Sequence, residues 1–277
     1  MPVFVFLSGY FTSEQADIAK QKRWIKATLM LYLIAQLGHF VFRAGCDYFI
    51  ASHNNTAYNI PLFTWKNIVI PYHSMWYLQC LIYWRVVAWN LYRKLNDTTW
   101  IIVSILLSLA SGFIPIDTEF SFQRAFVFFP FFMLGMIFRI RGEMLRIYKV
   151  PYLYAIIGLV IGILIVRYLP IFIPKRHYTT LLQPIIRMLQ SVMGIYICLL
   201  VIRVLRVNFV EKFSKFGAHT MWIYIGQSYS SMAAILLFPV FGVSLNLISS
   251  LVLTCLCCAV FIVLNCIWKR LTESRRT

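Results

Sequence analysis

The residues that could do chemistry in this sequence are the charged and polar ones that interrupt apolar stretches. The densest group is the basic cluster KQKRWIK at residues 20–26. Within it, Arg23 and Lys26 would lie one helical turn apart, a spacing at which two cations can bind phosphate groups together. The cluster is therefore a candidate phosphate-binding site, and a role in membrane orientation alone is the alternative.

Three apolar stretches also carry polar residues at helical spacing, so each set would lie on one face of a helix. Because polar groups are costly in lipid, we expect these faces to point inward and to line a hydrated cavity. Hydrogen bonds between neighbouring helices are the alternative for each set. The sets are Tyr32, Gln36, His39 and Arg43; Gln183, Arg187, Gln190, Ser191 and Gly194; and Thr220, Tyr224, Gln227, Ser228 and Ser231.

The sequence lacks the motifs of several other kinds of catalytic and metal chemistry. It contains no zinc motif, P-loop or GxSxG block, so metal-assisted hydrolysis, ATP chemistry and serine-hydrolase chemistry lack support. The seven cysteines lie mostly in apolar runs and form no CxxC…CxxC pattern. We therefore predict neither a disulfide framework nor a metal site.

Composition indicates which elements must position these residues. Of the 277 residues, 61% are hydrophobic and only 13% are charged, and the mean hydropathy is +0.75. Soluble proteins average about 45–50% apolar and about 25% charged residues. The composition therefore indicates a membrane protein and excludes a cytoplasmic enzyme.

Nine apolar stretches are long enough, or nearly so, to cross a hydrocarbon core about 30 Å thick as helices. We therefore predict an all-α, polytopic transmembrane helical bundle of about nine spans, forming a single integral-membrane domain over residues 1–277. The stretches are 1–12, 27–45, 73–92, 99–115, 124–138, 151–173, 180–202, 217–240 and 243–268.

The basic residues indicate the orientation of this bundle. Eighteen of the Lys and Arg residues fall on one set of connections and five on the other. The positive-inside rule places the first set, with the C-terminus, in the cytoplasm, and it places Met1 outside. The net charge of +17 is thus mainly a topology signal, and we expect a multi-pass protein of the cell membrane without a nucleic-acid partner. The longest connection, 46–72, would face outside, either as a cover over a substrate entrance or as an ordinary loop.

Four motifs occur in order along essentially the whole chain. They are MPVFVFLSGYF at 1–11 followed by the basic turn, HSMWYLQCLIYWR at 73–85, RAFVFFPFFMLG at 124–135 and FGAHTMWIYIGQS at 216–228. Together they resemble the integral-membrane acyltransferase family three, specifically its branch like the fucose 4-O-acetylases. The third motif is the most specific of the four, whereas Ser8-Gly9-Tyr10 is weaker alone.

This resemblance implies an O-acyltransferase that moves an acetyl group from acetyl-CoA to a hydroxyl of a cell-surface or lipid-linked carbohydrate. Arg23 and Lys26 are similar to the family's RxxR-type pair and would bind the donor, although lysine lacks the bidentate fork of arginine. No metal is expected. Residues that would line the acceptor path are Trp76, Tyr77, Arg124, Arg187 and Gln227; the last stands where the family often has histidine.

The resemblance also implies one further helix upstream of Met1, carrying the histidine thought to activate the acceptor hydroxyl. We therefore expect a chain that is truncated at its N-terminus relative to the family. Loss of a general base typically removes about 10²–10⁴ in rate, so such a chain would be weakly active or inactive. His39 and His73 are the candidate substitutes, and a structural role is the alternative for both.

A transporter or flippase for a glycan or lipid is the alternative function, because polar faces around a cavity also suit transport. Inverted repeats and paired broken helices would favour it, and we find neither in the sequence. A non-catalytic membrane partner is a third hypothesis, which depends on the expected truncation.

Overall fold

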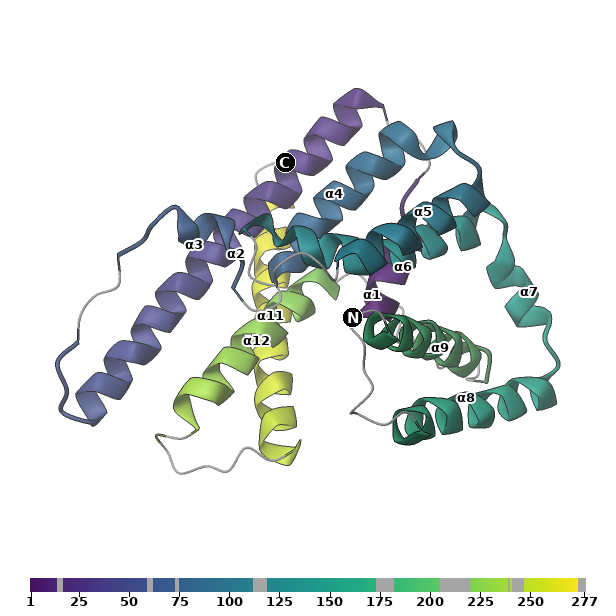
Figure 1. Cartoon of the computed structure of the whole chain (residues 1–277). Helices are drawn as coiled ribbons and strands as arrows, with labels where there is room; N and C mark the ends of the chain where they lie inside the picture. Colours follow the sequence, from purple (N-terminus) through teal and green to yellow (C-terminus); the bar gives the residue numbers. More distant parts are fainter. Residues whose placement is uncertain are drawn as a thin grey trace. The chain divides into compact units, whose positions relative to one another are not determined.

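The computed structural model of this chain is helical, and the described residues contain no strand (Figure 1). Each predicted apolar stretch overlaps one of the longer helices, which confirms the all-α class. These helices are α1 (Pro2–Tyr10), α2 (Ile18–His53), α4 (Trp76–Leu91), α5 (Asp97–Ala110), α6 (Phe122–Ile140), α8 (Tyr152–Phe172), α9 (Leu182–Val204), α11 (Thr220–Leu237) and α12 (Leu247–Glu273). Shorter elements are α3 (Lys66–Val69), η2 (Tyr92–Lys94), η4 (Glu119–Ser121) and α7 (Glu143–Lys149). The structure describes residues 1–13, 17–58, 62–72, 75–111, 119–172, 182–204, 220–238, 240 and 247–273.

Three of the described helices are long and apolar enough to cross a membrane: α2, α6 and the part Pro184–Val204 of α9. Shorter apolar helical segments are Asp97–Ala110, which is α5, Tyr152–Ile165 within α8 and Leu251–Val260 within α12. The total of about nine spans therefore stays a prediction. The 36 residues of α2 correspond to about 54 Å at 1.5 Å per residue. Since a hydrocarbon core is about 30 Å thick, α2 extends beyond the apolar layer.

The exposed face of α8, which points away from the other helices of its unit, is apolar, as expected for a surface in contact with lipid. Ile157, Val160 and Leu164 share one face and are 44%, 51% and 48% exposed. On the opposite side, Gly158 and Gly162 lie against side chains of α9. Two small residues four positions apart let membrane helices approach closely, and this spacing explains the packing of α8 on α9.

The helices form two compact units. The first comprises Met1–Lys26 and Gln79–Val210, and the second comprises Ala27–Leu78 and Glu211–Thr277. In the first unit, α6 packs against α1 and α5, while α9 packs against α1 and α8. In the second unit, α11 packs against α12. The single domain over 1–277 stays a prediction.

Two glycines allow α1 and α6 to cross at very close range in the first unit. A Cβ atom on Gly9 would run into the backbone carbonyl of Phe132, and a Cβ atom on Gly135 would run into that of Phe6. Backbone atoms cannot move aside as a flexible side chain can, so only glycine permits this approach. The SGY motif and the end of the RAFVFFPFFMLG motif are therefore packed against each other.

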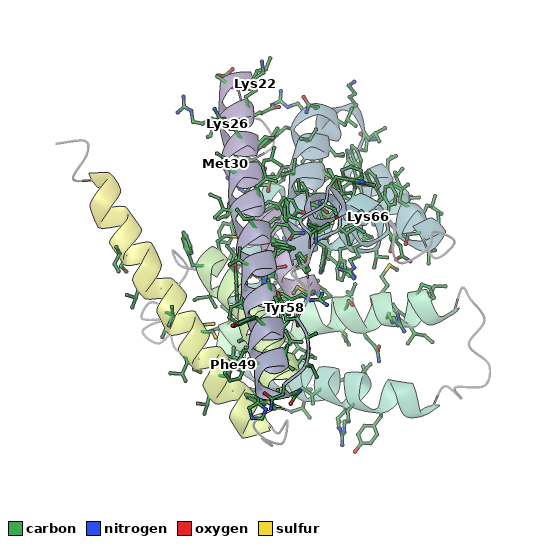
Figure 2. All side chains as sticks on the ribbon, turned by 90° about the vertical axis from the view of Figure 1, so that its left-hand side faces the viewer. Lys22, Lys26, Met30, Phe49, Tyr58 and Lys66 are labelled. Carbon is green, nitrogen blue, oxygen red and sulfur yellow. The ribbon has the colours of Figure 1, made fainter. Side chains whose placement is uncertain are left out.

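The connection after α2 is not a simple outer loop. α2 continues to His53, and the chain then returns to form α3. Figure 2 shows Lys66, at the start of α3, at a level between Met30 and Tyr58, and thus well back from the far end of α2. The expectation of a loop over all of 46–72 was therefore wrong in part, because polar side chains of α2 provide partners for the returning backbone.

Gln36, near the middle of α2, is the main partner of that backbone and is only 1% exposed. Its Nε2 donates to the carbonyl oxygens of Asn67 and Ile70, at 2.8 and 2.7 Å. Its Oε1 accepts the backbone N–H of Tyr72 at 3.2 Å. Irregular backbone at membrane depth is tolerated where protein groups satisfy its hydrogen bonds, and Gln36 does this for the segment around α3.

Candidate functional site

A pocket of about 810 Å³ lies between α1, α5, α6 and α9 of the first unit. This volume is within the range of about 300–1,000 Å³ that is usual for small-molecule sites. Its wall comprises Pro2, Val3, Ser108, Ser111, Gln123, Val127, Phe128, Phe131, Pro184, Arg187, Met188, Gln190, Ser191 and Gly194.

The pocket lies at the ends of these helices that are predicted to face outside. Its wall includes the first residues of α1, the last turn of α5, the first turns of α6 and the first half of α9. The charge pattern of the sequence places each of these ends on the outer side. On that predicted topology, the pocket would be an extracytoplasmic site.

Arg187 of α9 is exposed at this pocket. Gln190, Ser191 and Gly194 line the pocket on the same helix face, so the predicted polar face of this stretch is confirmed for the described side chains. The side chain of Gln183, also in the predicted set, lies outside the described residues. Among the residues that the structure describes, no carboxylate forms an ion pair with Arg187. The pocket therefore contains a cation without a protein counter-charge in the described part of the chain.

The wall opposite α9 combines polar and apolar groups. The Ser111 hydroxyl donates to the carbonyl oxygen of Ser108 at 2.6 Å, and the amide of Gln123 donates to that of Ser111 at 3.4 Å. Phe128 and Phe131 supply apolar surface. Because amide and hydroxyl groups keep acceptor capacity after these bonds, the pocket suits a ligand with a polar and an apolar part.

The serines of this wall are not among the three polar faces predicted from the sequence. Ser104, Ser108 and Ser111 follow positions i, i+4 and i+7 within an apolar stretch, which is the spacing that identified the other polar faces. All three are buried, and the latter two line the pocket. The same signal would therefore have found this wall.

Arg23 and Lys26, the predicted donor-binding pair, are both exposed in the first turns of α2. Figure 2 shows Lys22 and Lys26 together at one end of this helix, with Phe49 towards the other. Exposed cations one turn apart remain available to a polyphosphate ligand. The structure therefore keeps the pair together, as the spacing predicted.

Trp24 anchors this pair to α4. The guanidinium carbon of Arg85 lies 4.2 Å from the centroid of the Trp24 ring, and the Trp89 ring meets the same indole edge to face at 5.4 Å. Such cation–π contacts are worth about 0.5–2 kcal/mol. The Arg85 guanidinium thus lies over the indole that is next to Arg23 in the chain.

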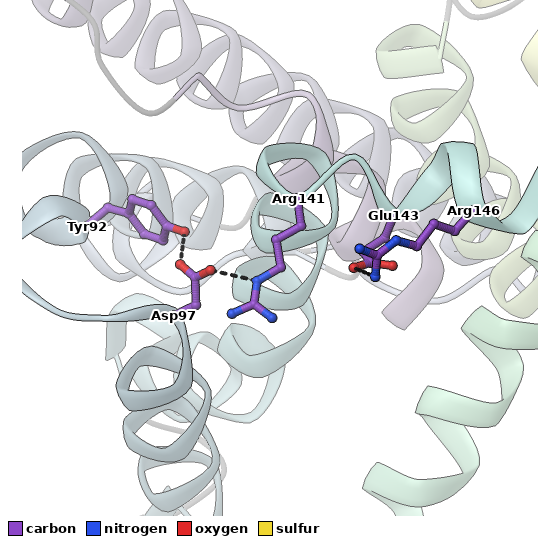
Figure 3. Close-up of polar contacts among 5 residues, drawn as sticks. All are labelled: Tyr92, Asp97, Arg141, Glu143 and Arg146. Atoms are coloured by element: carbon purple, nitrogen blue, oxygen red, sulfur yellow. Dashed lines mark hydrogen bonds and ion pairs between the residues drawn. The ribbon is translucent and has the colours of Figure 1, made fainter.

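An ionic cluster joins the other ends of α5 and α6 (Figure 3). Asp97 accepts the Tyr92 hydroxyl at 2.5 Å and the Arg141 Nε at 2.8 Å, while Glu143 pairs with Arg146 at 2.8 Å. The Tyr92 hydrogen bond and then the Arg141 guanidinium lower the pKa of Asp97 below its ordinary value of 3.8. The 11 residues from Asp97 to Ser108 correspond to about 16 Å of helix, so this cluster lies well away from the pocket.

His39 belongs to the second unit and is completely buried. Its ring stacks on that of Tyr229, with centroids 3.9 Å apart, and lies 6.3 Å from the ring of Tyr72. A histidine packed in this way fits the structural alternative better than acid–base catalysis. His73, the other candidate, lies outside the described residues.

Three predicted acceptor-path residues also lie in the second unit, apart from the pocket's wall. Trp76 and Tyr77 are buried, at 7% and 2% exposure, and the Tyr77 ring contacts that of Tyr224 at 5.2 Å. They are packed core aromatics and present no open face. Gln227 is exposed on α11. In the first unit, Arg124 follows Gln123 in the chain but is not part of the pocket's wall. Of the five residues predicted for the acceptor path, Arg187 is therefore the one that lines this pocket.

The comparison with protein families decides the broad class. The family model described as "Acyltransferase domain" (Acyl_transf_3) matches residues 1–267. The chain belongs to acyltransferase family three. It is thus a membrane acyltransferase, and its bilayer location agrees with the apolar helices. Comparisons of this acyltransferase with curated proteins and with solved structures found no match.

Proposed function

We propose that this acyltransferase moves an acetyl group from acetyl-CoA to a hydroxyl of a cell-surface or lipid-linked carbohydrate, as in the branch like the fucose 4-O-acetylases. It would act in the cell membrane with its C-terminus in the cytoplasm. The observation that carries the proposal is the pairing of two sites in one unit. Exposed cations lie at the predicted cytoplasmic side, and an amphipathic pocket lies at the predicted outer side.

The donor would be held by its phosphates. Coenzyme A carries several phosphate groups at one end and the acyl thioester at the other, so a cation pair can bind it without approaching the reacting carbon. Arg23 and Lys26 suit this role because both are exposed and one turn apart. Trp24, fixed by Arg85 and Trp89, limits the positions that the two cations can take.

The reaction is the attack of the acceptor hydroxyl oxygen on the thioester carbonyl carbon. A C–O bond forms, the C–S bond breaks, the coenzyme A thiolate leaves and the hydroxyl proton passes to a base. The catalytic base stays unassigned, since none of the described residues that line the pocket is His, Asp, Glu or Cys.

The test is transfer of labelled acetyl groups from acetyl-CoA to the carbohydrate fraction of membranes that contain the full chain. We expect label in an ester that mild alkali releases, and none in membranes that lack the chain. Label that appears equally in both preparations, or none with any acyl-CoA and glycan offered, would contradict the proposal. The transporter alternative gains no support from the family match.

A further inference from the structure

We infer that the outer pocket binds an anionic amphiphile, so that the acceptor carries a phosphate or carboxylate group and an apolar chain besides its reacting hydroxyl. This inference rests on the proposed function and names the acceptor class of its site. It starts from the charge of the pocket: Arg187 is the charged residue among those that line it in the described part of the chain.

A ligand that fills the pocket must displace water from around Arg187. Among the described residues no carboxylate pairs with this guanidinium, so a neutral ligand would leave it desolvated without a counter-charge. Stranding a charge in this way is strongly unfavourable, whereas an anion that arrives with the ligand removes the penalty. A guanidinium also matches the geometry of phosphate and carboxylate oxygens.

The rest of the wall defines the other parts of the ligand. Phe128, Phe131, Val127 and Met188 supply apolar surface, which suits a hydrocarbon chain. The amide of Gln123 supplies hydrogen-bonding groups close to this surface, which suits sugar hydroxyls. An amphiphile with a charged, sugar-bearing head thus matches the pocket better than a neutral soluble sugar does.

The experiment measures binding of defined amphiphiles to the purified full chain by native mass spectrometry, without acyl-CoA. The probes are dodecyl phosphate and neutral dodecyl maltoside. We expect Arg187→Gln to weaken dodecyl phosphate binding by about 10- to 100-fold, the loss of one charge-assisted contact. The same variant should strengthen dodecyl maltoside binding, because glutamine leaves no charge to be stranded by a neutral ligand. Arg187→Lys should recover part of the affinity. The matched control is Arg167→Gln, which removes an exposed arginine of α8 that is not part of the pocket's wall.

Equal affinities of Arg187→Gln and Arg167→Gln for dodecyl phosphate would overturn the inference. A bilayer phospholipid is the other source of such a phosphate, and competition distinguishes the two. Both dodecyl phosphate esterified to glucose and short-chain phosphatidylglycerol carry a phosphate and an apolar chain, but the hydrogen-bonding groups of Gln123 suit the sugar hydroxyls. The glucosyl compound should therefore displace the probe at a lower concentration; displacement at equal concentrations, or the reverse order, overturns the acceptor assignment. Arg187-dependent binding without any acetyl transfer would instead contradict the proposed function alone.

Discussion

Replacing Gly9 with alanine tests the helix crossing that joins the two motifs of the first unit. The added methyl group would meet the carbonyl oxygen of Phe132, and the reciprocal change at Gly135 would meet that of Phe6. Since both obstacles are backbone, the helices must separate. Overpacking of this kind costs about 1–3 kcal/mol, and the higher helix propensity of alanine offsets up to about 1 kcal/mol. We expect a net loss of about 1–2 kcal/mol for each variant.

The matched control is Gly45→Ala in α2, where nothing lies within 4 Å of the added carbon. Its stability should stay the same or rise slightly. The assay is thermal unfolding of the purified full chain in detergent, in which a loss of about 1–2 kcal/mol corresponds to a fall of roughly 2–8 °C in Tm. Because one substitution already separates α1 from α6, the double variant should lose less than the sum of the single losses. If Gly9→Ala is as stable as Gly45→Ala, the close crossing is wrong.

Three further changes follow from the structure. Asp97→Asn should make stability depend less on pH in acid. Because the pKa of Asp97 is lowered in the folded chain, its ionised carboxylate contributes to the free energy of unfolding fully above pH 3.8, its ordinary pKa. This contribution is lost as the pH falls further. Tm measured against pH checks this, and equal slopes for both proteins in acid would contradict it. Gln36→Leu should lower the free energy of unfolding by about 2 kcal/mol or more, because buried backbone groups lose their partner; exposed Gln227→Leu is the control, and equal stability of the two variants would refute the role of Gln36. Trp24→Ala should weaken acetyl-CoA binding in titrations more than Trp24→Phe does, since phenylalanine keeps an aromatic face for Arg85, and equal affinities would argue against an anchoring role.

Periodicity within a single stretch was enough to predict much of the fold. The apolar stretches became helices, and the polar face through Arg187 became one wall of the pocket. These features depend on residues three or four positions apart, which lie on the same face of any helix. Family membership likewise followed from motifs that are contiguous in the chain.

Contacts between distant segments could not be predicted in this way. Of the predicted set on α2, Tyr32, Gln36 and His39 are buried, whereas Arg43 is exposed. Gln36 binds the backbone around α3, and His39 stacks on Tyr229. A periodic pattern indicates that a face is covered and does not indicate what covers it. For the same reason the Trp24–Arg85 contact, between residues 61 positions apart, has no signature in either local sequence.

The affinity of the chain for acetyl-CoA tests the central claim most directly. We expect the double variant Arg23→Ala/Lys26→Ala to raise the Kd by about 10- to 100-fold, as expected for the loss of two exposed charge-assisted contacts. Arg93→Ala/Lys94→Ala is the matched control, because it removes the same two charges from exposed positions on the same predicted side. A selective rise in Kd for the first variant supports donor binding by Arg23 and Lys26, whereas equal affinities of the two variants would contradict it.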